Sequence, residues 1–105
     1  MDHSSTIVRD DPDRHRYEIL VDGRVAGFAA YHVRGGRYFF VHTEIADEFE
    51  GQGLGSQLAR AALDDVRTKS ALVVPLCPFI AAWIDKHPDD AYLVDRELLA
   101  TITGD

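Results

Sequence analysis

Three glycines at alternate positions, Gly51, Gly53 and Gly55, lie between a run typical of a strand and a run typical of a helix. Glycine has no side chain to keep an anion away, so the backbone N–H groups of such a turn can converge on a phosphate or diphosphate. A helix that begins there adds its positive end and its free N–H groups. The spacing therefore predicts a diphosphate site, although a flexible turn that only starts a helix would contain the same glycines.

Two other phosphate-binding motifs fit this turn less well. A P-loop needs Lys followed by Ser or Thr after its last glycine, whereas Gly55 is followed by Ser56 and Gln57. A dinucleotide-binding fold needs an acidic residue at the end of the next strand, and residues 71–74 contain none.

The single cysteine, Cys77, follows an apolar run and directly precedes Pro78, a residue favoured at the first position of a helix. A thiol at the positive end of a helix can have a lowered pKa and act as a nucleophile. A lone cysteine is also often a small buried core residue, and both interpretations remain open. One cysteine excludes an internal disulfide and any multi-cysteine metal site, so no metal is expected.

His42 and Glu44 are two residues apart in a predicted strand, which places them on the same face. An imidazole paired with a carboxylate can act as general base and orienting group for an attacking amine. A polar pair on a solvated face has the same pattern. Zinc deaminases also use His-x-Glu, but they require Pro-Cys-x-x-Cys, and Cys77 has no second cysteine. The remaining histidines, at positions 3, 15 and 32, show no ligand spacing.

Alternating apolar residues and two turn signals predict an antiparallel meander before the glycine turn. Asp22-Gly23 and Gly35-Gly36 favour tight hairpins, because glycine supplies the positive φ that such turns need. The predicted strands cover residues 6–10, 14–21, 24–34 and 37–46.

After the turn, apolar residues recur at spacings of three and four and predict a helix over 54–69. Residues 71–76 read as a strand buried on both faces, and a helix is expected from Pro78 to about His87. The tail supplies Tyr92 and several aliphatic residues for docking. The order is β-β-β-β-α-β-α, an α+β fold in which helices pack on one mostly antiparallel sheet.

The composition excludes several classes of function. With 105 residues the chain is expected to form one domain, residues 1–105. A formal charge of −7 argues against binding to nucleic acid and to anionic membranes, and weakly favours cationic partners. No apolar run approaches the ~20 residues of a membrane-spanning helix, and the first residues lack a signal-peptide pattern, so a cytoplasmic location is expected.

Residues 45–58, which contain the glycine turn, resemble the acetyl-CoA-binding motif of the GCN5-related N-acetyltransferase (GNAT) superfamily, Arg/Gln-x-x-Gly-x-Gly/Ala. His42-Thr43-Glu44, the Pro-x-Cys-Pro-Phe segment at 75–79 and His87-Pro88 resemble a minimal, single-domain branch of that superfamily. The resemblance spans about residues 17–94.

The resemblance implies a truncated GNAT-like acyl-CoA N-acyltransferase fold and an acetyl-CoA-dependent transfer of acetyl to an amine. Backbone groups of Ile45 and Ala46 would pair with the pantetheine amides, and Cys77 would lie near the acetyl group, either as a transient nucleophile or as a packing residue. The predicted contacts with the co-substrate are Ile45, Phe49, Glu50, Gly51, Gln52, Gly53, Leu54, Gly55, Ser56, Phe79, Trp83 and His87. Phe79, Trp83 and His87 have the alternative of being core residues.

Glu50 departs from the motif, because the family usually has Arg or Gln there. A carboxylate repels a diphosphate, so a weakened affinity for coenzyme A is expected. From its length, the chain is also expected to be too short for the N-terminal helices that usually build the acceptor wall. The site for a small-molecule or peptide amine is therefore expected to be open or completed by a second subunit, as a homodimer. The alternative function is a non-catalytic module that binds coenzyme A, an acyl-CoA or a partner protein.

Overall fold

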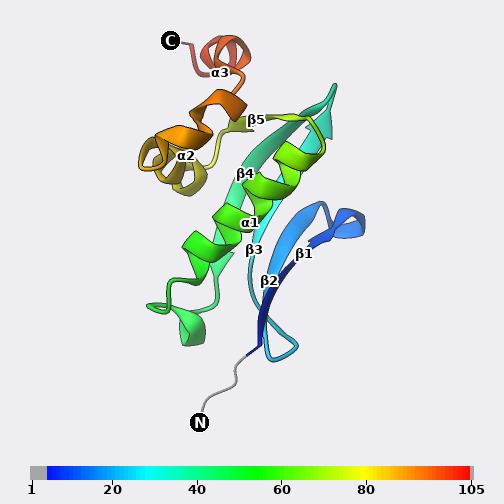
Figure 1. The fold of residues 1–105 in the computed structure, drawn as a ribbon, viewed down its shortest axis with the longest axis vertical. Helices are drawn as coiled ribbons and strands as arrows, with labels where there is room; N and C mark the ends of the chain where they lie inside the picture. The colour runs from blue at the N-terminus through cyan, green and yellow to red at the C-terminus, as the bar shows by residue number, and fades with distance from the viewer. Residues whose placement is uncertain (1–4, 105) are drawn as a thin grey trace.

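The computed structural model describes residues 5–104, so His3 lies outside the described residues. Five strands form one sheet in the order β1-β2-β3-β4-β5, as the ribbon shows (Figure 1). The strands are β1 (Thr6–Asp11), β2 (Arg16–Val21), β3 (Arg24–Arg34), β4 (Arg37–Ile45) and β5 (Leu72–Pro75). The helices are α1 (Leu54–Thr68), α2 (Pro78–Asp85) and α3 (Arg96–Thr103). Three 3-10 turns, Pro12–Arg14, Asp47–Phe49 and Pro88–Leu93, connect these elements.

The first four strands form the antiparallel meander that the sequence predicts. Asp22 and Gly23 both adopt positive φ, as do Gly35 and Gly36, and these two tight turns match the right-handed twist of the strands that they join. β5 runs parallel to β4, because α1 carries the chain back across the sheet. The mostly antiparallel α+β fold is therefore confirmed.

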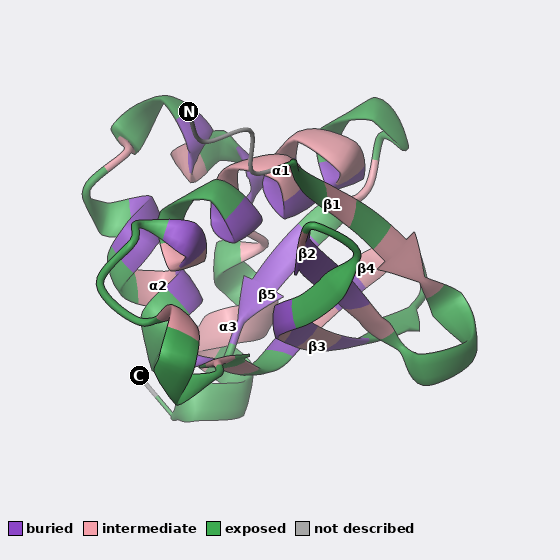
Figure 2. Ribbon diagram, turned by 90° about the horizontal axis from the view of Figure 1, so that it is seen from below, coloured by how far each residue is buried: buried purple, intermediate pink, exposed green. Residues whose placement is uncertain are grey.

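The core lies between the sheet and two helices. α1 buries its apolar stripe against all five strands, and α2 contributes Ile80, Trp83 and Ile84. In Figure 2 the buried segments of α1, α2 and the central strands lie toward the middle of the molecule. Tyr17 is held there by a hydrogen bond that its hydroxyl donates to Asp65 at 2.6 Å, and burial next to this carboxylate raises the pKa of Tyr17.

β4 contains a bulge at Val41. Tyr31 pairs with Phe40 and Ala30 pairs with His42, so Val41 is an extra residue without a partner in β3. Phe40 points into the core, whereas Val41 and His42 both lie on the face of the sheet away from α1, called the outer face below. The bulge thereby returns Thr43 and Ile45 to the core side.

A buried carboxylate lies on the outer face. Glu18 is fully buried beneath the side chains of Arg9 and Arg16, which donate to it at 2.9 and 2.8 Å. Burial disfavours its charge, but the hydrogen bonds from Arg16 and Arg9 outweigh burial and hold the pKa of Glu18 below its usual range.

The C-terminal segment differs from the prediction. α2 ends at Asp85 rather than near His87, and the sequence analysis did not predict α3. The Asp95 side chain caps α3 by accepting a hydrogen bond from the N–H of Leu98. Tyr92 was expected to dock, but its side chain is 63% exposed, because the turn of residues 88–93 buries Asp90 and Leu93 instead. No helix among residues 5–104 is long and apolar enough to cross a membrane.

Candidate active site

β4 and β5 pair over a short distance and then separate. β5 pairs with β4 only from Arg37 to Phe40, and the last backbone contact is the hydrogen bond that the N–H of Cys77 donates to the carbonyl of Phe40 at 2.8 Å. Beyond it, no strand in the described part of the chain pairs with residues 41–45 on the side away from β3. This half of β4 therefore has an open edge.

The glycine turn lies at the end of that open edge. Gly51 and Gly53 adopt φ values of 82° and 75°, and Gly53 is the N-cap of α1 without any side-chain cap. Among residues 5–104, no hydrogen-bond acceptor is found for the N–H groups of residues 51–56. These six consecutive donors, together with the start of a helix, fit an anion of the size of a diphosphate.

A cavity of about 460 Å³ joins the turn to the strand edge and to α2. All of its lining residues are among the predicted co-substrate contacts: Ile45, Phe49, Glu50, Gly51, Gly53, Leu54, Gly55, Ser56 and Phe79. The Phe79 ring packs over Gly55, where an added Cβ would come within 2.9 Å of it. Gly55 thus lets the Phe79 ring lie directly against the start of α1, whereas Gly51 and Gly53 leave open space above the backbone.

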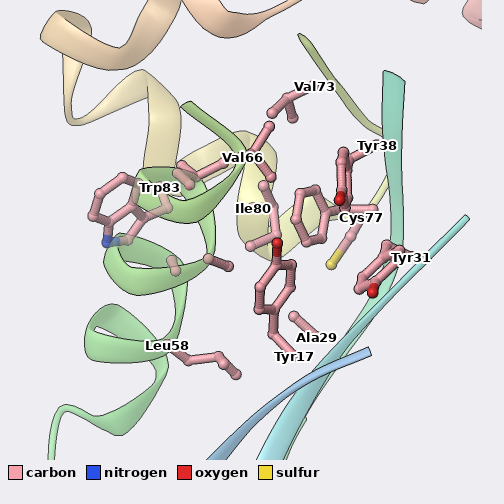
Figure 3. Close-up of a cluster of buried hydrophobic side chains, with 14 of the residues drawn as sticks. Tyr17, Ala29, Tyr31, Tyr38, Leu58, Val66, Val73, Cys77, Ile80 and Trp83 are labelled. Atoms are coloured by element: carbon pink, nitrogen blue, oxygen red, sulfur yellow. The ribbon is translucent and has the colours of Figure 1, made fainter. Parts of the chain in front are cut away.

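Cys77 lies deeper along the same strand edge and is only 3% exposed. Its Sγ donates to the Thr43 Oγ1 at 3.3 Å, so the thiol faces the core side of β4 just past the separation of the strands. Figure 3 shows Cys77 among the core side chains, whereas the Trp83 ring lies at the edge of the cluster beside α1. Thr43 was missed in the sequence analysis, and its only signal was its position between His42 and Glu44.

His42 and Glu44 lie on the other side of β4, on the outer face. Their Nε2 and Oε1 atoms are 3.8 Å apart, and the side chains are 62% and 53% exposed. The His42 ring also lies 5.9 Å from the ring of Phe28 on β3. The sequence correctly placed the two residues on one face, but the bulge puts that face opposite to Cys77.

Comparisons with known proteins agree with this geometry. A family profile described as GCN5-related N-acetyl-transferase matches residues 16–93. The chain belongs to this family. It is 30% identical over 96 residues to Protein NATD1 of Xenopus tropicalis, and the match covers 89% of this chain and 88% of that protein. The solution structure of a GCN5-like protein from Staphylococcus aureus has the same fold, with a TM-score of 0.64, 19% identity and coverage of 84% and 86% of the two chains.

Membership of the GCN5-related family places the chain in the N-acetyltransferase class, whose fold generally uses acetyl-CoA as co-substrate. The match covers β2 to β5, the glycine turn, α1 and α2, but it does not include β1 or α3.

Among the described residues that line the cavity, Glu50 is the only ionisable one. The nearby Arg24 is paired with Glu48 and lies over the Phe49 ring at 5.4 Å. Since no lysine or arginine of residues 5–104 lines the cavity, any anion held here by this GCN5-related chain would depend on backbone N–H groups and would lie near one carboxylate.

Three predicted contacts lie away from the cavity lining. Gln52 is exposed on the turn. Trp83 is largely buried, and His87 stacks on it with ring centroids 3.7 Å apart while its Nδ1 lies 2.6 Å from the Trp83 carbonyl. The Arg60 guanidinium of α1 also lies over the Trp83 ring, at 4.7 Å. Trp83 and His87 thus pack against each other and against α1. This packing agrees with the alternative interpretation, in which the two residues belong to the core.

Proposed function

We propose that this chain is an acetyl-CoA-dependent N-acetyltransferase that transfers an acetyl group to an amine. The observation that carries the proposal is the continuity of the six free N–H groups of residues 51–56 with the open edge of β4. Within an N-acetyltransferase family, a donor-rich turn and an unpaired strand edge are what a diphosphate followed by an amide-bearing arm requires.

The residues present fit acetyl-CoA as substrate. The N–H groups of residues 51–56 would bind the diphosphate, and the backbone of Ile45 and Ala46 would pair with the pantetheine amides like an added strand. At about 3.3 Å per residue, residues 41–45 extend about 13 Å, so a ligand held at the turn can follow the edge to the Cys77–Thr43 pair. Phe79 and Phe49 would cover its apolar parts.

His42 would act as general base. Its imidazole would accept the proton of the attacking amine while Glu44, 3.8 Å away, stabilises the resulting positive charge. The nitrogen forms a bond to the acetyl carbon, the bond between that carbon and the coenzyme sulfur breaks, and the released thiolate takes up a proton. This direct route needs no covalent enzyme intermediate.

Cys77 offers a second route. Its Sγ would form a bond to the acetyl carbon as the coenzyme thiolate leaves with the Cys77 proton, and the amine would then take the acetyl group from Cys77. The buried thiol, hydrogen-bonded to Thr43, and the position of His42 on the opposite face both support the direct route more strongly.

The test is the release of free thiol from acetyl-CoA in the presence of an amine library, with calorimetry of acetyl-CoA binding alongside it. Turnover that depends on both the amine and His42 supports the proposal. Tight binding without turnover would instead identify a non-catalytic acyl-CoA-binding module, a function that the exposure of the His42–Glu44 pair also allows. Absence of binding would reject both.

We also propose that a second subunit covers the acceptor site. This proposal rests on the exposure of the outer face around His42, and sedimentation velocity tests it. A fully active monomer would exclude the dimeric site.

A further inference from the structure

A second groove lies on the outer face, at the junction of β3, β4 and the end of β5. Its volume is about 520 Å³, which is within the usual range for small-molecule sites. It is lined by His15, His32, Val33, Arg34, Phe39, Val41 and Leu76. His32 pairs with Phe39, next to the Tyr31–Phe40 pair that points into the core, and this alternation places the groove on the face opposite α1.

The groove reaches the point where β4 and β5 separate. Val41 is the bulge residue, and Leu76 directly precedes Cys77, whose N–H makes the last contact between the two strands. His42 follows Val41 on the same face. A ligand in the groove would therefore approach the separation point from the side opposite to the glycine-turn cavity and beside the proposed base.

The charge of this groove is opposite to that of the whole protein. The chain contains 18 acidic residues, yet among the described residues 5–104 the groove lining includes one arginine, two histidines and no carboxylate. Across residues 5–104, no acidic partner is found for Arg34, whereas Arg37 of the same hairpin is paired with Asp95 at 2.6 Å. The rings of His15 and His32 lie 6.4 Å apart.

The other walls are apolar and accessible. Val33, Val41 and Leu76 are all exposed, and the partly buried Phe39 also lines the groove. His15 is held in place by a left-handed backbone conformation, with φ of 56°, and by the hydrogen bond that its carbonyl accepts from the N–H of Tyr31 at 2.8 Å.

We propose that this groove binds the acyl acceptor and selects primary amines whose apolar body ends in a carboxylate. The inference rests on the proposed function and names its substrate class. The amine lies toward Val41 and Leu76, the apolar body lies on Phe39, and the carboxylate lies toward Arg34, His15 and His32. The net charge of the chain favours a cationic acceptor, but an acceptor in the groove would interact mainly with the basic residues that line it.

Two probes that differ only at one end test the inference: 4-(aminomethyl)benzoate and 4-methylbenzylamine. We expect the wild type to acetylate the carboxylate probe with a kcat/KM about fivefold higher, since a single ion pair at an accessible site contributes about 1 kcal/mol. Arg34→Gln should abolish the preference, because it should lower the kcat/KM for 4-(aminomethyl)benzoate to the value for 4-methylbenzylamine. Lys86→Gln is the matched control, because Lys86 is an exposed cation outside the groove lining and should retain the preference.

A binding measurement separates this inference from the proposed function. In a ¹⁵N-labelled sample, 4-(aminomethyl)benzoate should shift the amide signals of His32, Val41 and Leu76. Shifts at these residues without acetylation would keep the groove and reject the transferase. Acetylation with equal kcat/KM for both probes, or the absence of shifts in the groove, would overturn the inference.

Discussion

The thiol of Cys77 lies 3.3 Å from the hydroxyl of Thr43, across the point where β4 and β5 separate. The thiol donates to this hydroxyl and lies on the core side of β4. The proposed base, His42, is the adjacent residue of the same strand but lies on the other face. The two groups nearest to the proposed site of transfer are therefore separated by the strand itself.

Replacement of Cys77 by alanine tests the direct route. We expect Cys77→Ala to retain kcat within about tenfold, because the amine would attack the thioester without help from the thiol. The substitution should lower the free energy of unfolding by about 1 kcal/mol, since it removes a buried sulfur. A folded but inactive Cys77→Ala variant, together with an acetyl adduct mapped to Cys77 in the wild type, would establish the two-step route instead.

Replacement of the proposed base, His42, should strongly lower the activity, in contrast to replacement of Cys77. His42→Gln should lower kcat about 100-fold and leave acetyl-CoA binding unchanged, because general-base catalysis contributes a factor of that order and the side chain lies outside the cavity. Glu44→Gln should cause a smaller loss. Stopped assays and calorimetry on the same preparations measure the two effects, and equal kcat values for His42→Gln and the wild type would remove the base from the mechanism.

Glu50 should weaken the binding of acetyl-CoA. Glu50→Arg is expected to tighten it by about 1 kcal/mol, or about fivefold, and the gain should shrink at high salt because the site is open to solvent. Titration calorimetry at two ionic strengths checks this prediction. Glu97→Arg on α3 is a control with the same change of net charge, and unchanged or weaker binding by Glu50→Arg would contradict the placement of the diphosphate on the turn.

Replacement of Gly55 by alanine should weaken acetyl-CoA binding without lowering the stability of the fold. Gly55→Ala places a Cβ against the Phe79 ring, which is 40% exposed and can swing away into the cavity. Alanine favours the helix by up to about 1 kcal/mol, so urea denaturation should show stability equal to or above that of the wild type. Acetyl-CoA binding should nevertheless weaken. A variant that binds normally would show that Phe79 does not contribute to the cavity wall.

The stability of the fold should decrease at low pH, because Glu18 loses its charge there. The pKa of Glu18 is lower in the folded chain than in the unfolded chain, so the unfolded state binds more protons as the pH falls. The contribution of Glu18 is complete above its unfolded pKa of about 4.3 and is lost as the pH falls through the folded value. Glu18→Gln should cost about 1–3 kcal/mol at pH 7 and reduce the slope of stability against pH below about 4.3, as measured by urea denaturation. An unchanged slope would assign the acid sensitivity to other carboxylates.

Much of the fold could be predicted because its signals are local. Asp22-Gly23 and Gly35-Gly36 provide the positive φ that the two hairpins need, and the spacing of Leu54, Leu58 and Val66 matches the buried stripe of α1. The residues of the glycine turn came together in one cavity because they are consecutive. Helix α3 was missed because it spans only eight residues, too few for the spacing of its apolar residues to distinguish a helix from an irregular docked tail.

The sequence did not allow us to predict which residues of β4 share a face of the sheet, because this depends on the unpaired bulge residue Val41. Strict alternation would place Phe40 and His42 on the same side, and nothing in the residue type of Val41 marks it as the bulge. His15 and His32 were set aside because their spacing matches no ligand motif. They come together through the pairing of β2 with β3, which a spacing rule does not capture.

The bulge has a consequence for the natural variation of such chains. Inserting one residue after Val41, with the bulge kept, would invert every later side chain of β4, so that Thr43 would leave the core and His42 would enter it. Deleting Val41 would remove the bulge and leave His42 and Thr43 on their present faces. Point substitutions between Phe40 and Ile45, and the loss of Val41 itself, leave the later residues on the same faces, but an added residue does not. Homologues should therefore differ in residue type along this segment, and some should lack the bulge residue, but none should contain an additional residue there.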